Sequence, residues 1–212
     1  MPRLLLIAAA SYLLGSIPFG YLVVRIFRGE DVRQSGSGNI GATNVSRKSP
    51  VLGVMTLVLD ALKGSAAVAL AAYLSGQTGT TKPYEAMSLA ALSAVVGHMY
   101  PIWLKFRGGK GVATGLGSFV IIAPNAVLIA AAIFVCAVLV FRYVSLGSIL
   151  SVAAFPVLVW LLREYGNAWL ALALMSLASV LIVARHQENI RRLRAGTEHR
   201  FGYKSVSRSE KR

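Results

Sequence analysis

The chain has 212 residues, of which 56% are hydrophobic, and it carries a formal net charge of +14 at pH 7. A water-soluble domain is usually about 45–50% apolar, so this composition excludes an ordinary soluble protein and predicts a single integral membrane domain. The basic residues lie in short segments between long apolar runs, which favours anionic headgroups and phosphate compounds over nucleic acid as ligands.

Long apolar segments along the chain predict membrane-spanning helices. Only α-helices and closed barrels satisfy backbone polar groups in lipid, and these segments lack the alternation of barrel strands. The predicted spans are 4–27, 51–75, 86–104, 111–124, 126–141, 145–162 and 168–184. Pro124 and Asn125 mark the turn after the short fourth span. The prediction is an all-α integral membrane protein with seven transmembrane helices.

The basic residues predict how these spans are oriented. With the N-terminus outside, nearly all of them fall on the inner side, and the exceptions are Arg3, Lys63, Lys82 and Arg163. The positive-inside rule therefore places the N-terminus outside and the C-terminus in the cytoplasm. We expect residues 1–203 to form a seven-helix membrane domain and residues 204–212 a basic flexible tail. The chain after about Gly196 is expected to be loosely ordered.

The loop after the first span is rich in glycine and in hydrogen-bond donors. Gly36, Gly38 and Gly41 have the spacing of a dinucleotide-binding loop, but that motif requires a preceding strand, and here a membrane helix precedes it. Glycine still allows backbone N–H groups to converge on an anion, and Arg47 adds a guanidinium that can bind phosphate through two bonds. The alternative is a flexible turn that carries topology charges. The candidate residues are Ser37, Gly38, Asn39, Gly41, Thr43, Asn44 and Arg47.

The second span contains Asp60 and Lys63, three residues apart on one helical face. A charge near the bilayer centre costs about 2.5–3.5 kcal/mol on insertion scales, so such residues are by default functional. Two roles remain open for this pair, which are support of the first loop and direct contact with a substrate.

A second glycine-rich segment runs from His98 to Thr114. Its glycines surround Lys110 where the next span begins, and a helix N-terminus beside a lysine is suited to bind an anion. Residue 111 is Gly rather than Ser or Thr, which excludes a Walker A loop. The alternative is a juxtamembrane turn with snorkelling side chains. The candidate phosphate ligands are Gly108, Gly109, Lys110 and Gly111, with His98 as a supporting residue.

The last three spans carry further polar residues at their inner ends. Arg142 and Ser145 flank the turn between the fifth and sixth spans, and His186 and Asn189 share a helical face after the seventh. Each of them alone is ordinary interface polarity. The predicted topology, however, places all four on the same side as both glycine-rich loops.

Together these segments resemble the bacterial acyl-phosphate:glycerol-3-phosphate acyltransferase family (PlsY). The matching stretches are 15–20, 37–44 with Arg47, 60–64, 98–114, 142–145 and 185–190, and the resemblance extends to about residue 203. It implies a multi-pass enzyme of the bacterial inner (plasma) membrane that transfers a fatty acyl group from acyl phosphate to the 1-hydroxyl of sn-glycerol 3-phosphate. The products would be 1-acylglycerol 3-phosphate (lysophosphatidic acid) and phosphate, in the first step of phospholipid biosynthesis.

Within this interpretation each candidate residue receives a role. The predicted catalytic residues are Ser37, Asn39, Arg47, Lys110, His186 and Asn189. The predicted phosphate-binding residues are Gly38, Gly41, Thr43, Asn44, Gly108, Gly109, Gly111, Arg142 and Ser145. Asp60, Lys63 and His98 are supporting residues. We expect no cofactor and no metal, no nucleic acid, a monomer, and membrane lipid as the surrounding partner.

Acyl phosphate is an activated mixed anhydride, so positioning and oxyanion stabilisation can suffice for catalysis. We therefore expect the glycerol hydroxyl to attack directly, without an acyl-enzyme, and its proton to pass to a substrate phosphate oxygen or to His186. A membrane transporter of organic phosphate is the competing function. Transporters usually have repeated halves and a site at the midplane. This chain shows no repeat and has its donors on one face.

Overall fold

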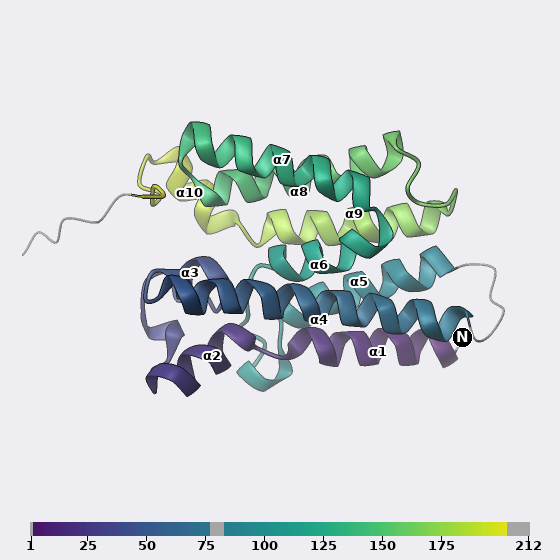
Figure 1. Ribbon diagram of the computed structural model, residues 1–212, viewed down its shortest axis with the longest axis horizontal. Coiled ribbons are helices and arrows are strands. Elements are labelled where there is room, and N and C mark those ends of the chain that lie inside the picture. Colours follow the sequence, from purple (N-terminus) through teal and green to yellow (C-terminus); the bar gives the residue numbers. More distant parts are fainter. Residues whose placement is uncertain (1, 77–82, 203–212) are drawn as a thin grey trace, which may run out of the picture.

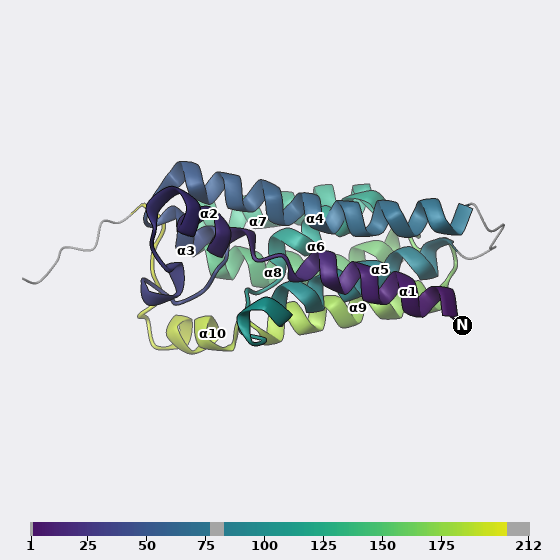
Figure 2. The same ribbon diagram turned by 90° about the horizontal axis from the view of Figure 1, so that it is seen from below.

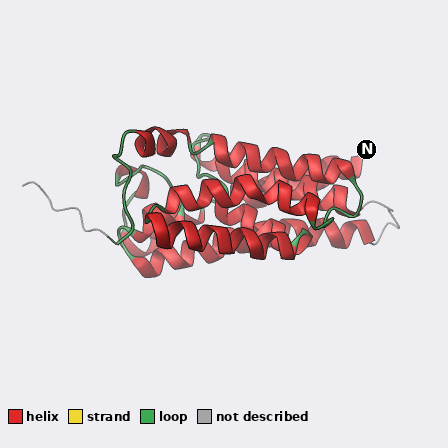
Figure 3. Ribbon diagram, turned by 90° about the horizontal axis from the view of Figure 1, so that it is seen from above, coloured by secondary structure: helices red, strands yellow, loops and turns green. Residues whose placement is uncertain are grey.

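The computed structural model describes residues 2–76 and 83–202, and every regular element within these ranges is a helix (Figure 3). The elements, with η1 and η2 as short 3-10 turns, are α1 (Pro2–Ser16), α2 (Phe19–Arg28), η1 (Val32–Gln34), α3 (Ala42–Ser46), α4 (Pro50–Gly76), α5 (Pro83–Met99), η2 (Ile102–Leu104), α6 (Val112–Ile122), α7 (Pro124–Phe141), α8 (Val144–Leu161), α9 (Trp169–Ala184) and α10 (Gln187–Arg194). The predicted all-α class is confirmed. The predicted tail, 204–212, lies outside the described residues.

The surface of the bundle is apolar where it would face lipid. Leu5 of α1 is 70% exposed, and Leu128 and Leu139 of α7 are 70% and 73% exposed, respectively. Small residues and hydroxyl groups are buried instead, among them Ala90, Ser88 and Ser118. Soluble monomers rarely expose large contiguous apolar patches, and lipid is the solvent that tolerates them. The chain is therefore a multi-pass membrane protein.

Five helical segments are long and apolar enough to cross a bilayer, namely Pro2–Arg28, Pro50–Gly76, Pro83–Leu104, Pro124–Phe141 and Val144–Leu161. α9 becomes a sixth when it is counted together with α10, which is bent by 51° from it. α6 has 11 residues and is about 16 Å long, roughly half of the ~30 Å hydrocarbon core. All seven predicted segments are helical, but only five or six are candidate spans by length and composition.

The two ends of the bundle differ in structure (Figure 1). At one end lie the start of α1, the end of α4 and the connection between α8 and α9. The other end, here called the basic end, is formed by α2, α3, α10 and the turn between α7 and α8 (Figure 1). α6 starts on the side of the basic end and α7 returns to it, so this pair of helices begins and finishes on one side.

The first predicted span is broken in the middle. α1 ends at Ser16 and α2 begins at Phe19, because Pro18 cannot continue the hydrogen-bond ladder of a helix. The break frees the carbonyl of Ile17, which accepts a hydrogen bond of 2.7 Å from Lys63 Nζ of α4. Lys63 also forms an ion pair with Asp60 at 2.8 Å. The buried lysine thus connects α4 to the break in the first span.

Glycines allow the helices of the bundle to approach one another closely. A Cβ atom on Gly97 of α5 would lie 2.2 Å from the carbonyl oxygen of Tyr12 in α1. One on Gly117 of α6 would lie 1.9 Å from the carbonyl oxygen of Ala61 in α4. Membrane helices associate largely through such close backbone packing, because lipid removes the hydrophobic driving force. These contacts hold α4, α5 and α6, whose ends carry the polar loops.

Candidate active site

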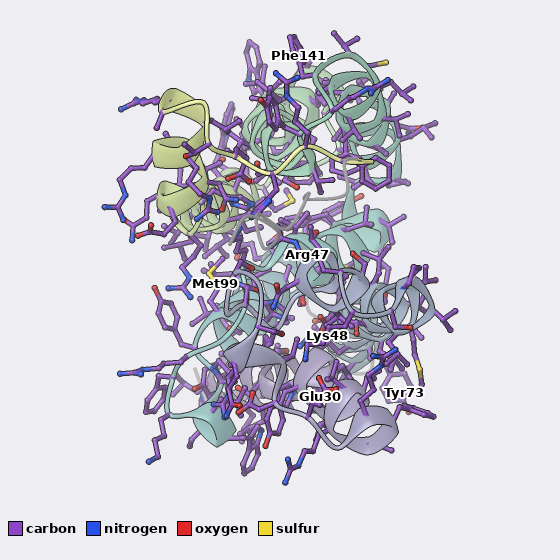
Figure 4. All side chains as sticks on the ribbon, turned by 90° about the vertical axis from the view of Figure 1, so that its left-hand side faces the viewer. Glu30, Arg47, Lys48, Tyr73, Met99 and Phe141 are labelled. Carbon is purple, nitrogen blue, oxygen red and sulfur yellow. The ribbon has the colours of Figure 1, made fainter. Side chains whose placement is uncertain are left out.

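A pocket of about 670 Å³ opens at the basic end, and it is here called the main pocket. Segments that are distant in sequence line it, from the first loop, the start of α6, the start of α8 and the region of α10. Figure 4 looks onto this end and places Arg47 centrally. The predicted residues that line the pocket are Ser37, Asn39, Gly41, Thr43, Asn44, Arg47, Asp60, His98, Lys110, Gly111, Ser145, His186 and Asn189.

Asn44 organises the first loop rather than offering its side chain to a ligand. Its Oδ1 accepts the backbone N–H of Ser37 at 2.9 Å. Its Nδ2 donates to three carbonyl oxygens, those of Val32, Ser35 and Asn39, at 3.2, 3.0 and 2.8 Å. These bonds use the side chain's hydrogen-bonding capacity. Asn44 therefore fixes the loop that carries Ser37 and Asn39 along the pocket.

Lys110 lies in the second loop, immediately before α6. The preceding residues are fixed by backbone bonds from Gly108 N–H to Met99 O at 3.1 Å and from Gly109 N–H to His98 O at 3.0 Å. The ammonium of Lys110 donates to Asn189 Oδ1 of α10. Burial lowers the pKa of Lys110 to about 8, and nearby arginines contribute to the same shift. The lysine is still mainly a cation at neutral pH.

His186 stands at the junction of α9 and α10. Its Nδ1 lies 2.8 Å from the carbonyl oxygen of Ile182. A carbonyl can only accept, so Nδ1 carries the proton and Nε2 has a free lone pair. Burial, followed by the charge of Lys110, lowers the pKa of His186 to about 4. The histidine is neutral at physiological pH and its Nε2 can accept a proton.

Glu198 is a pocket residue that the sequence did not indicate. Its Oε1 accepts bonds from Ser145 Oγ and Asn189 Nδ2, both at 2.7 Å, and its Oε2 accepts from Arg192 Nε at 2.6 Å. Burial by itself would raise the pKa of Glu198, but these hydrogen bonds bring it below its usual value. The expectation of loose order after Gly196 is wrong up to residue 202, because this carboxylate anchors the segment. The signal in the sequence that could have identified Glu198 is its position as an acidic residue within a strongly basic stretch.

Some of the predicted residues lie outside the main pocket. Arg142 is exposed, and its carbonyl accepts the N–H of Phe201 at 2.6 Å. The carbonyl of Gly109 faces the guanidinium of Arg185, while Gly38 and Gly108 line a separate hollow. Lys63 forms an ion pair with Asp60 and donates a hydrogen bond to the carbonyl of Ile17 at the break in the first span. Within residues 2–76 and 83–202, no group of three or more His, Cys, Asp or Glu side chains could hold a metal ion.

Asp60 and His98 connect the membrane interior to the floor of the pocket. Both are buried and both line the pocket, with His98 Nδ1 3.5 Å from Asp60 Oδ1. His98 is packed against the second loop so closely that a Cβ on Gly109 would lie 1.9 Å from its Nε2. Of the two roles left open for the charged pair, Lys63 fits support, while Asp60 also faces the pocket.

Comparison with known proteins identifies the family. A family model described as glycerol-3-phosphate acyltransferase matches residues 5–196. This chain belongs to the glycerol-3-phosphate acyltransferase family. It is 47% identical over 193 residues to the glycerol-3-phosphate acyltransferase of Syntrophotalea carbinolica, covering 91% of this chain and 94% of the relative. It is 46% identical over 205 residues to that of Agrobacterium fabrum, covering 96% and 95%, respectively.

Two solved structures of a family member have the same fold. Both are crystal structures of PlsY, described as an integral membrane glycerol 3-phosphate acyltransferase. Its glycerol 3-phosphate form has a TM-score of 0.84 and 37% sequence identity, and its lysophosphatidic acid form has a TM-score of 0.81 and 35% identity. Each comparison covers 94% of this chain and 96% of the PlsY chain. The predicted family resemblance is confirmed.

Proposed function

We propose that this chain transfers a fatty acyl group from acyl phosphate to the 1-hydroxyl of sn-glycerol 3-phosphate, releasing 1-acylglycerol 3-phosphate and phosphate. The observation that carries the proposal is the main pocket, which gathers Arg47, Lys110 and hydroxyl and amide donors from separate segments. Its relatives are named glycerol-3-phosphate acyltransferases, and the solved relative has glycerol 3-phosphate and lysophosphatidic acid forms. Acyl phosphate as the donor is what the family resemblance implies, and the positive charge of the pocket suits a phosphorylated donor.

Two phosphate groups must lie near each other during this reaction, and they repel. A cation at about 4 Å from an anion contributes ~4 kcal/mol at an effective dielectric constant of 20. Among the described residues, four cationic side chains line the pocket beside two carboxylates. The cations are Arg47, Lys110, Arg192 and Arg200, and the carboxylates are Asp60 and Glu198. This excess of positive charge supports the binding of two phosphorylated substrates.

The acyl chain can remain among lipids during transfer. Leu57 of α4 lines the pocket and is nevertheless 43% exposed on the lipid-facing surface of the bundle. Burial of a methylene group contributes about 0.8 kcal/mol, so a long chain is held strongly in apolar surroundings. The acyl group therefore reaches the pocket sideways, beside α4, while glycerol 3-phosphate arrives from water.

In the reaction the 1-hydroxyl oxygen attacks the carbonyl carbon of acyl phosphate, and the bond from that carbon to the phosphate oxygen breaks. The electron pair leaves with inorganic phosphate. Neutral His186 Nε2 or an oxygen of substrate phosphate takes the hydroxyl proton. Ser37 and Asn39 position substrate, and Asn189 holds Lys110. An activated donor requires positioning more than a strong base, so no acyl-enzyme forms.

The basic end lies in the cytoplasm, with the start of α1 outside and the protein a monomer in the bacterial plasma membrane. Arg25, Arg28, Arg33, Arg47 and Lys48 all belong to the segments of the basic end, whereas Arg163 lies in the connection at the opposite end. The positive-inside rule supports this orientation. The chain enters α6 on the side of the basic end and leaves α7 on the same side. The orientation of the other helices is therefore the same whether or not short α6 crosses the whole membrane.

The deciding experiment combines purified protein in detergent, synthetic palmitoyl phosphate and glycerol 3-phosphate. We expect 1-palmitoylglycerol 3-phosphate, identified by mass, together with an equal amount of phosphate. Palmitoyl-coenzyme A should not replace palmitoyl phosphate. Acyl-serine or acyl-cysteine trapped in a single turnover would refute the direct route. Uptake of labelled glycerol 3-phosphate into proteoliposomes without product would instead favour the transporter.

A further inference from the structure

A second hollow of about 460 Å³ lies beside the main pocket and shares no lining residue with it. Its charged residues are Arg33 after α2, Arg107 after η2 and Arg185 at the end of α9, with Asp31 as the carboxylate. Gly38 and Gly108 bring the backbones of both glycine-rich loops to its wall. Three guanidinium groups facing one carboxylate leave this second pocket with an excess of two positive charges.

Two of the guanidinium groups are held in place before any ligand binds. Arg33 donates from Nε and Nη2 to the Asp31 carboxylate, with a shortest distance of 2.6 Å, and stacks over Tyr21 at 5.0 Å. Arg185 donates to the Gly109 carbonyl and lies 5.2 Å from the centre of the Tyr100 ring. A guanidinium fixed in this way loses little freedom when it binds a phosphate oxygen.

Arg107 is carried by a turn with unusual backbone geometry. Lys105 and Phe106 both have left-handed backbone conformations, with φ of 52° and 60°, which non-glycine residues rarely adopt. Phe106 N–H bonds to Pro101 O at 3.0 Å, and Arg107 N–H bonds to Leu104 O at 3.1 Å. These bonds hold the strained turn, which brings Arg107 to the same hollow as Arg33 and Arg185.

The same turn has the composition of a membrane interface. Trp103 and Phe106 are 62% and 57% exposed, and Lys105 and Arg107 lie next to them in sequence. Aromatic rings beside basic residues are typical of the headgroup level of a bilayer. Arg185, at the end of α9, lines the same hollow as Phe106 and Arg107 of this turn, and Figure 2 shows α10 following α9 toward the basic end. The second pocket thus lies next to a surface suited to lipid.

We propose that the second pocket binds the phosphate headgroup of an anionic membrane lipid. The arginines bind the phosphate oxygens, while the acyl chains lie along the exposed side chains of the 102–106 turn. Arginine forks suit phosphate because they supply two parallel N–H donors. The site is separate from the acyl-transfer pocket, although Gly38 and Gly108 place its wall on the same two loops.

Lipid binding to the intact protein in detergent tests the proposal. Native mass spectrometry would count bound phosphatidic acid, with phosphatidylcholine as the neutral reference lipid. Wild type should retain phosphatidic acid at least tenfold better than phosphatidylcholine. Arg107→Ala should weaken that binding about tenfold, because it removes a charge-assisted fork. Arg28→Ala is the matched control, since it removes an exposed arginine of the same end that does not line the pocket.

Two further arms separate this site from the main pocket and from soluble phosphate. Arg47→Ala should keep the lipid, whereas it should lose acyl transfer, so failure of the proposed function leaves this test intact. Millimolar inorganic phosphate should not displace the lipid. Equal losses in Arg28→Ala and Arg107→Ala would overturn the proposal, as would displacement by inorganic phosphate or loss of the lipid in Arg47→Ala alone.

Discussion

Burial lowers the pKa values of two neighbouring residues in the main pocket, Lys110 and His186. The pKa of Lys110 falls to about 8 and that of His186 to about 4, in both cases mainly through burial. At pH 7 the pocket therefore contains a cationic lysine beside a neutral histidine. A cation suits substrate phosphate, and a neutral imidazole suits a hydroxyl proton.

The lowered pKa of Lys110 predicts an alkaline limit to activity. The lysine is charged below its folded-state pKa, so kcat/KM for glycerol 3-phosphate should fall as pH rises through about 8. Steady-state rates between pH 6 and 10 measure this. Lys110→Arg is the matched control, because arginine stays charged over that range and should abolish the alkaline fall. The same fall in both proteins would assign it to another group.

Arg47 and its neighbour Lys48 are expected to differ sharply. Arg47 lines the main pocket, while Lys48 forms an ion pair with Glu30 outside it. Figure 4 labels all three residues and shows Lys48 and Glu30 apart from the central position of Arg47. Charged hydrogen bonds contribute about 1.5–3 kcal/mol, so Arg47→Ala should lower kcat/KM more than tenfold. Lys48→Ala should change it less than twofold. Equal losses would show that net charge alone matters.

At the scale of elements, short α10 and the residues after it complete the pocket. The bend of 51° after α9 turns α10 across the basic end. Asn189 on α10 then reaches Lys110, and Glu198 after α10 reaches Ser145 of α8. Three segments distant in sequence are thereby joined by side-chain hydrogen bonds.

Glu198→Ala should destabilise the protein. It leaves the donors of Ser145, Asn189 and Arg192 without their shared acceptor, which costs about 1–3 kcal/mol. Thermal unfolding in detergent should show a lower midpoint. Glu188→Ala is the matched control, because Glu188 forms an exposed ion pair with Arg191 worth about 0–1 kcal/mol. Identical midpoints for the two variants would contradict the anchoring role of Glu198.

Close contact between α1 and α5 predicts that Gly97→Ala is destabilising. The new methyl group would overlap the Tyr12 carbonyl, and such overpacking costs about 1–3 kcal/mol. Gly76→Ala offers the comparison, since a Cβ there meets no atom within 4 Å. The unfolding midpoint in detergent should fall for Gly97→Ala only. A wild-type midpoint for Gly97→Ala would mean that α1 and α5 can move apart without loss of stability.

At the scale of the whole molecule, polar and charged segments are concentrated at one end. Both glycine-rich loops, α10 and the main pocket lie there, while apolar side chains cover the length of the bundle. A reaction between a water-soluble phosphate and a lipid-anchored donor needs such an arrangement, because the site must meet both phases.

The two ends of α4 provide a test of orientation. The background is Cys136→Ser, which removes the single cysteine of the sequence. Lys48→Cys lies two residues before α4, at the basic end, and Gly76→Cys lies at the last residue of α4, at the opposite end. A membrane-impermeant maleimide added to intact cells should label Gly76→Cys at once. It should label Lys48→Cys only after the membrane is permeabilised. The reverse pattern would place the basic end outside and refute the proposed topology.

The sequence by itself determined the helical membrane class, the two glycine-rich loops, the polar residues at the inner ends of the last three spans and half of the residues that line the main pocket. These properties follow from local apolar runs, glycine content and the sidedness of basic residues, which need no knowledge of distant contacts. The tertiary structure decided that Arg142 faces outward, that Asn44 binds its own loop and that α6 is short. The tertiary structure also placed Glu198 in the pocket, where it binds Ser145, which is 53 positions away in the sequence. Lys110 and Asn189, which bind each other, are likewise 79 positions apart. Which face of a loop a side chain occupies depends on such distant partners, and local patterns carry no information about them.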